Sequence, residues 1–238
     1  IEEKRGQAIA SYGRPLSNSV SLQASLGGEY SELSQVGAGG QSRSFWRPKG
    51  SVAIAYESSS GWDLNLRLQR RVGQLDFEDF LASVDVQTNN NNASNPSLVP
   101  PQSWQVELEA NRSLGNAGSV QLKLEAESIS DIVDQVPVSA TEEAVGNLPS
   151  ARRLRASLRT GIILDGLGLQ GGRIDATVVQ TSERLRDPLL GTRRSVTDAE
   201  PWTWRMEFRH DVPATPWVWG LQADQEGTRR IYRLDYDQ

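Results

Sequence analysis

The amino-acid sequence predicts an all-β protein, an antiparallel β-barrel that spans a membrane. Apolar and polar residues alternate in runs with a beat of about ten residues, and the connections between runs are alternately short and long. Alternation with period two places one set of side chains on each face of a β-strand, because successive residues point to opposite sides. One face of the predicted sheet is apolar and the other is charged, as in half of a sandwich or in the wall of a transmembrane barrel.

The clearest alternating runs lie at residues 62–69, 104–111 and 120–127. In the first, tryptophan and three leucines alternate with aspartate, asparagine, arginine and glutamine. The same pattern, read along the whole chain, predicts about ten strands. Their expected ranges are 4–12, 19–33, 43–57, 62–72, 103–114, 119–128, 152–164, 172–182, 202–211 and 217–225.

Short and long connections alternate strictly between these strands. Residues 58–61 and 115–118 form tight hairpin turns, and three further connections, at 14–18, 165–171 and 211–216, are compact and contain Gly or Pro. The long loops are expected at 73–102, 129–151 and 183–201. A soluble sandwich has no reason to keep one rim short and the other long, whereas an outer-membrane barrel has short periplasmic turns and long outside loops.

Tryptophan placement agrees with the membrane prediction. Trp62 and Trp217 directly follow short turns, and Trp104 and Trp202 directly follow long loops. Indole rings favour the headgroup level of a bilayer, so these four residues are expected to mark its two interfaces. The alternative is a soluble β-sandwich, in which the same four side chains would be buried against a second sheet.

Composition excludes several classes of function. The net charge of −5 is spread along the 238 residues, so no basic stripe indicates nucleic-acid binding. The chain has no cysteine, and its single histidine, His210, argues against most zinc sites and against a serine–histidine triad. Residues 166–171 match the glycine spacing of dinucleotide-binding loops, but alternating β-branched residues follow where a helix would be required. We therefore expect no enzyme activity, no cofactor and no metal.

Several stretches around the predicted loops carry a resemblance to a known family. They are Phe45–Lys49, Arg70–Phe80, Asn95–Trp104, Gly146–Arg152 and Asp187–Arg193. Taken in order, residues 43–225 resemble the C-terminal part of the barrel of TonB-dependent outer-membrane receptors. The resemblance implies a barrel of about 22 strands filled by an N-terminal plug. Residues 1–238 would then be a partial barrel domain without the plug and the final strands, in agreement with a first residue, Ile1, that is not methionine.

The resemblance also implies a function. The whole protein would lie in the bacterial outer membrane and take up a scarce nutrient of the siderophore, glycan or cobalamin class. Its partners would be outer-membrane lipid, the remaining strands and plug (in the same or a separate chain), and the TonB complex, which acts through the plug. A passive outer-membrane channel and a soluble sandwich-type binding module remain as alternatives.

Two loops supply the candidate ligand contacts. Asp76, Phe77 and Asp79 lie in the first of them, and Arg184 and Arg186 lie in the second. The two arginines belong to a basic group with Arg193 and Arg194 that suits an anionic ligand or the phosphates of lipopolysaccharide.

Overall fold

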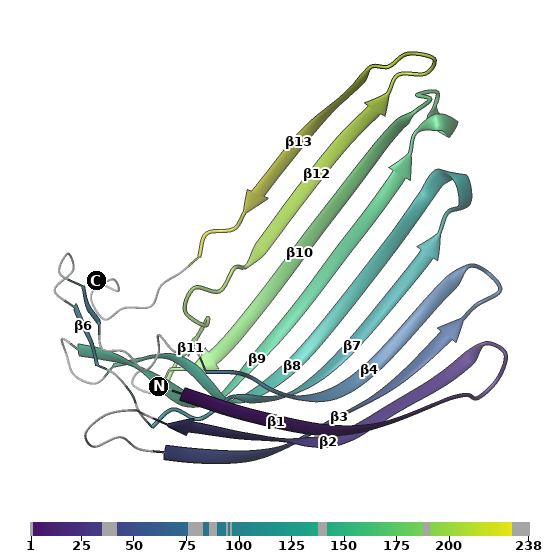
Figure 1. Ribbon diagram of the computed structural model, residues 1–238. Coiled ribbons are helices and arrows are strands. Elements are labelled where there is room, and N and C mark those ends of the chain that lie inside the picture. The colour runs from purple at the N-terminus through teal and green to yellow at the C-terminus, as the bar shows by residue number, and fades with distance from the viewer. Residues whose placement is uncertain are drawn as a thin grey trace.

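The chain forms one curved, largely antiparallel sheet. The computed structural model describes residues 2–34, 42–75, 83–85, 90–93, 95, 97–137, 142–187 and 191–229. Ten of the strands formed by these residues follow one another across the sheet in chain order, each hydrogen-bonded to the next (Figure 1). They are β1 (Glu2–Pro15), β2 (Val20–Ser34), β3 (Ser42–Glu57), β4 (Trp62–Val72), β7 (Gln102–Ser113), β8 (Gly118–Pro137), β9 (Glu142–Ile163), β10 (Gly172–Arg186), β12 (Trp202–Asp211) and β13 (Val218–Glu226).

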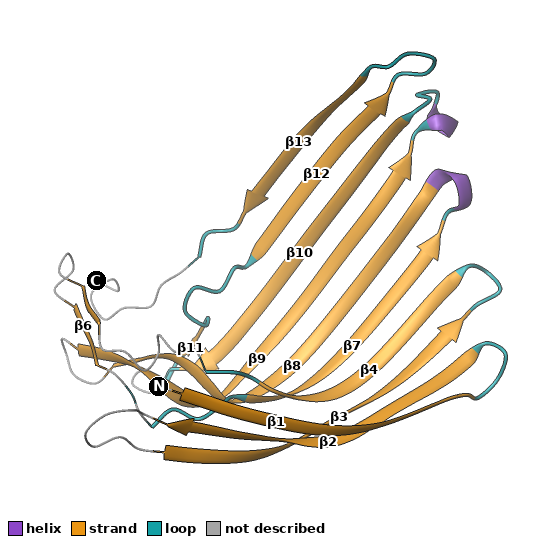
Figure 2. Ribbon diagram, viewed as in Figure 1, coloured by secondary structure: helices purple, strands orange, loops and turns teal. Residues whose placement is uncertain are grey.

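Three short strands lie off this path. The hairpin of β5 (Ser83–Asp85) and β6 (Asn90–Ala93) reaches the sheet where β6 pairs in parallel with β9. The two residues of β11 (Arg193–Arg194) pair with the end of β10. Figure 2 shows the two short 3₁₀ turns, η2 (Gly115–Ala117) and η3 (Asp165–Leu167), at the rim where the short connections gather. Among the described residues, no helix has the length and hydropathy needed to cross a membrane.

The ten expected strands are confirmed, and so is the gathering of the short connections at one rim. The expectation that residues 129–151 form a loop is wrong for most of that segment. Strand β8 continues to Pro137 and β9 begins at Glu142, so the two strands form a long hairpin that extends past its neighbours. The stretch at 73–102 contains the β5–β6 hairpin, and the stretch at 183–201 contains the end of β10 and β11.

The register sorts the side chains into two faces. One row of mutually opposed residues reads Leu64, Ala110, Leu122, Leu158, Val178 and Trp204 across six strands. We call this side of the sheet the apolar face and the opposite side the polar face. No second sheet formed by the described residues covers the apolar face, and Leu154 on it is 59% exposed. A sandwich would bury such side chains, because apolar surface is stabilised by removal from water.

The buried core is small and lies at the rim of the long connections, away from the centre of the sheet. Its packed cluster of buried side chains is formed by Ile129, Ile132, Leu148, Ala151 and Leu185. These residues come from the extended ends of β8, β9 and β10, so the core packs the long connections against the sheet and shapes the site described next.

Candidate ligand-binding site on the polar face

A continuous row of polar side chains crosses the polar face. In register across five strands it consists of Gln69, Gln105, Glu127, Arg153 and Glu183. Arg153, the fourth residue of the row, bridges the carboxylates on either side of it: Nη1 donates to Glu127 at 2.9 Å, and Nε donates to Glu183. The side chain of Gln69 donates to that of Gln105 at 2.5 Å. Contacts perpendicular to the strands thus join Gln69 to Gln105 at one end of the row and Arg153 to its two glutamates at the other. Between them, the Gln105 side chain donates to Glu125 at 2.7 Å.

Other charges on this face are also paired. Lys123 lies 3.0 Å from Glu107 and 3.5 Å from Glu125. Glu29, whose side chain is only 4% exposed, accepts from Arg5 at 2.5 Å and from Lys49 at 2.7 Å. Opposite charges on adjacent strands stabilise each other, and pairs shielded from water are screened less by salt.

Two residues of the polar row, Glu127 and Arg153, line a hollow of about 370 Å³ next to the long connections. Its wall is partly charged, from Arg71, Glu127 and Arg153, and partly apolar, from Ile132 and Val196. Arg71 donates to the side-chain oxygen of Gln105 at 3.2 Å, and no described residue supplies it with a carboxylate. A concave surface with a few convergent polar groups and an apolar wall is typical of small-molecule sites.

A local irregularity in β8 forms part of this wall. Ile129 and Ile132 have opposite parity in the strand, yet both belong to the same buried core. A regular strand would send them to opposite faces. Between them, Asp131 has a φ of 57°, a left-handed conformation that is rare for a residue with a side chain and that breaks the alternation.

The segment after the β5–β6 hairpin is attached to β9 through asparagine side chains. Asn147 accepts from the Val99 amide at 2.8 Å and donates back to the Val99 carbonyl at 2.9 Å. It also donates to the carbonyl of Asp131 at 2.7 Å. Asn95 donates to the Val145 carbonyl at 3.0 Å. The asparagine side chains thus satisfy backbone groups of an irregular segment, as a neighbouring strand would do.

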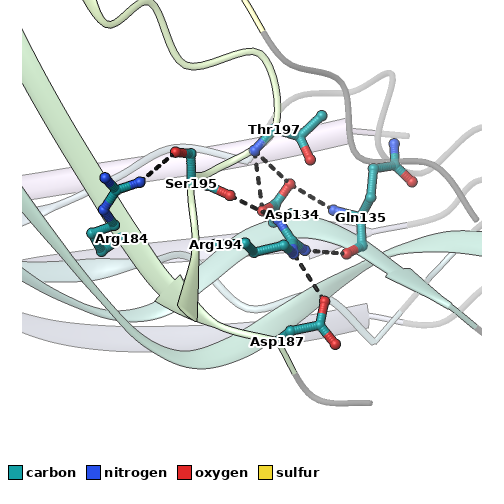
Figure 3. Close-up of polar contacts among 7 residues, drawn as sticks. All are labelled: Asp134, Gln135, Arg184, Asp187, Arg194, Ser195 and Thr197. Atoms are coloured by element: carbon teal, nitrogen blue, oxygen red, sulfur yellow. Dashed lines mark hydrogen bonds and ion pairs between the residues drawn. The ribbon is translucent and has the colours of Figure 1, made fainter. Parts of the chain in front are cut away.

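A buried ion pair attaches the next long connection to β8 (Figure 3). Arg194 is 9% exposed in its side chain, and its Nη1 lies 2.8 Å from Asp134, which is 2% exposed. The same guanidinium donates through Nε to Asp187 at 3.0 Å and through Nη2 to the Gln135 carbonyl at 3.0 Å. The Asp134 carboxylate also accepts from the Thr197 amide at 3.3 Å. Both long connections are therefore held by the β8–β9 hairpin.

None of the candidate ligand contacts predicted from the sequence is among the described residues that line the hollow. Asp76, Phe77 and Asp79 lie outside the described residues. Arg184 and Arg186 are exposed, and both have the parity of Val178, which places them on the apolar-face side of β10 and away from the hollow. They remain predicted contacts.

Two of the predicted interface tryptophans are paired with arginines. At the short-turn rim, the Arg112 guanidinium lies 5.0 Å from the Trp62 ring centroid, and at the other rim Arg70 lies 5.7 Å from that of Trp104. Trp104 is 53% exposed and Trp217 is 71% exposed, so neither is buried as the sandwich alternative requires. Trp202 lies opposite Gln180, in register with the apolar face.

Sequence reasoning missed the residues that build the hollow and hold its loops. The only signal for Arg153 was its place in an alternating charged run, which a solvated outer face would show equally. Asp134 carried no signal, because its partner lies 60 residues away in the chain. Asn147 was noted only as part of the Gly146–Arg152 resemblance, and nothing in the sequence pointed to its partner 48 residues away. The described residues contain no group of three or more His, Cys, Asp or Glu side chains placed to hold a metal ion.

Solved structures of TonB-dependent transporters share the fold of this chain. The copper transporter OprC matches with a TM-score of 0.71 and 13% identity over 91% of this chain and 33% of its own. The FrpB iron transporter from Neisseria meningitidis (F3-3 variant) matches with a TM-score of 0.68 and 9% identity over 93% of this chain and 32% of its own. The siderophore receptor PiuA from Acinetobacter baumannii matches with a TM-score of 0.65 and 10% identity over 94% of this chain and 33% of its own.

The 238 residues thus span about a third of the length of these proteins, and the expected fold, a segment of their kind of barrel, is confirmed. No protein-family model matches the chain, and neither does any curated protein sequence.

Proposed function

We propose that this chain is a segment of the wall of a TonB-dependent outer-membrane receptor that takes up a scarce nutrient. The observation that carries the proposal is the division of one continuous sheet into an apolar and a polar face, with short turns at one rim and packed connections at the other. Such a sheet is stable when the apolar face meets lipid and the polar face meets a wet lumen. The structural neighbours, whose names describe a copper transporter, an iron transporter and a siderophore receptor, support this function.

In this proposal the hollow beside Glu127 and Arg153 of the polar row is part of the ligand site. Arg71 offers a cation without a carboxylate partner among the described residues, and Ile132 and Val196 offer an apolar wall beside it. A ligand with an acidic group and an apolar body would match both features. Asp76, Phe77 and Asp79 are proposed to contribute to the same rim, as predicted from the loop sequence.

Uptake by cells that depend on the full-length protein tests the proposal. Iron-loaded siderophores, labelled cobalamin and labelled oligosaccharides would be offered in turn to cells with and without the gene. A ligand whose uptake requires the gene would then be tested against Arg71→Gln, which we expect to weaken its binding by about tenfold, the scale of one charge-assisted hydrogen bond. Arg67→Gln is the matched control, because Arg67 lies on the same strand and face but does not line the hollow. Uptake that never depends on the gene would overturn the proposal.

A further inference from the structure

Four arginines form two like-charged pairs on the apolar-face side of the sheet, at the rim of the long connections. Arg152 on β9 lies directly opposite Arg184 on β10, and Arg186 on β10 lies directly opposite Arg193 on β11. All four side chains are exposed. The parity of β10 gives Arg184 and Arg186 the same face, so both pairs lie side by side on one surface. We call these four residues the arginine cluster.

Within the described part of the chain, the arginine cluster has no compensating negative charge, in contrast to the polar face. Like charges directly opposite each other on adjacent strands are destabilising. Among the described residues no carboxylate pairs with any of the four. Their recorded partners are neutral: Arg184 donates to the Ser195 hydroxyl at 2.9 Å (Figure 3), and Arg186 donates to the Gly191 carbonyl at 3.1 Å. On the polar face, by comparison, Arg153 contacts two glutamates.

The position of the cluster relative to the apolar face indicates which negatively charged group neutralises the four arginines. Leu154 lies two residues after Arg152 on β9, farther from the rim of the long connections, so their Cα atoms are about 7 Å apart along the strand. The register carries the Arg152 position across Ser128 to Trp104, which has its own arginine, Arg70, at the ring. The cluster therefore begins one row beyond the last apolar row, at the level of an aromatic residue. At a membrane this is the headgroup level, where arginine side chains meet lipid phosphates.

We propose that the arginine cluster binds the phosphate groups of an anionic membrane lipid in the leaflet next to the long connections. Guanidinium groups bind phosphate oxygens through two parallel hydrogen bonds, and four of them on one surface can hold more than one phosphate. This site rests on the proposed membrane location of the apolar face. It assigns Arg184 and Arg186 to a lipid instead of the transported ligand.

Lipid binding by the detergent-solubilised full-length protein tests the site. The protein would be titrated with bisphosphorylated lipid A and, separately, with phosphatidylcholine, and bound lipid counted by native mass spectrometry. We expect Arg152→Gln/Arg184→Gln to weaken lipid A binding by about tenfold or more and to leave phosphatidylcholine binding unchanged. Wild-type binding of lipid A should weaken as salt concentration rises, because the contact is between exposed charges.

The matched control is Arg159→Gln/Arg205→Gln, which removes two arginines from the polar face of β9 and β12. Equal loss in this control, or unchanged lipid A affinity in the cluster variant, would overturn the proposal. Displacement of lipid A by 10 mM inorganic phosphate would show a free-anion site and would overturn it as well. A different result would overturn the proposed receptor function: absence of the wild-type protein from the outer-membrane fraction.

Discussion

The side chain of Asn147 forms two hydrogen bonds with the backbone of Val99, 48 residues earlier in the chain. Val99 belongs to the motif Asn95–Trp104, and Asn147 belongs to the motif Gly146–Arg152. The sequence resemblance rested on these motifs as separate signals, and the structure shows that they contact each other. The two motifs are therefore physically attached to each other through Asn147 and Val99.

Replacement of Asn147 by alanine should loosen the segment at Val99. The variant leaves the amide and carbonyl of Val99 without these partners, at a cost of about 1–3 kcal/mol for each group that water does not reach. Hydrogen exchange of the peptide covering residues 95–101 should become faster, while exchange in β4 stays unchanged. Asn111→Ala is the control, because the Asn111 side chain donates to the Glu109 side chain on the polar face and to no backbone group among the described residues. Equal protection in Asn147→Ala and the wild type would contradict the role assigned to Asn147.

Replacement of Asp134 by alanine should destabilise the second attachment. It leaves the Arg194 guanidinium, 9% exposed, without one of its two carboxylates, and removal of one partner from a buried pair costs about 3–5 kcal/mol. Because the ion pair with Asp187 remains, we expect the loss of folding free energy to lie at the lower end of this range. Limited proteolysis between residues 187 and 201 should accelerate.

The control for this variant is Asp175→Ala, which breaks the exposed pair with Arg173. Exposed pairs contribute little, because water and salt screen them. A loss of stability in Asp175→Ala as large as that in Asp134→Ala would show that burial of the pair has no special effect.

Replacement of Gly118 by alanine should block the hairpin between β7 and β8. Gly118 has a φ of 122°, and a Cβ atom there would lie 1.9 Å from the Gly161 carbonyl oxygen on β9. Because that atom is backbone, the sheet itself would have to move. The yield of folded protein should fall sharply. It is measured by gel electrophoresis as the band whose mobility changes when the sample is boiled. Gly166→Ala should fold normally, since nothing lies within 4 Å of its added Cβ.

The alternating pattern was sufficient to predict the strands of the main path, because a mostly apolar and a mostly polar face leave a period of two along the strands. It failed from Ile129 to Ala151, where Pro137 and Pro149 interrupt the pattern and where Asp131 changes the parity of β8. There the buried residues pack against loops instead of following one face. Local sequence cannot express that packing, since it depends on partners far away in the chain.

The candidate site was harder to predict for the same reason. Arg184 and Arg194 are close in sequence and were grouped in one basic loop, yet Arg194 is buried against Asp134 and Arg184 is exposed on the other side of β10. Only the register of β10 and β11, with Leu185 opposite Arg194, separates the two. The predicted basic group therefore combined one buried, ion-paired arginine with exposed arginines on the other side of the sheet.

The central claim, that the apolar face contacts lipid, is tested most directly by two single cysteines on β4. The 238 residues contain no cysteine, so Leu66→Cys and Asn65→Cys each introduce one thiol within this segment, on the apolar and the polar face respectively. The full-length protein would be labelled with bimane and placed in vesicles of phosphatidylcholine brominated on its acyl chains. We expect strong quenching at residue 66 and little at residue 65. Equal quenching at the two positions, or none at residue 66, would contradict the account.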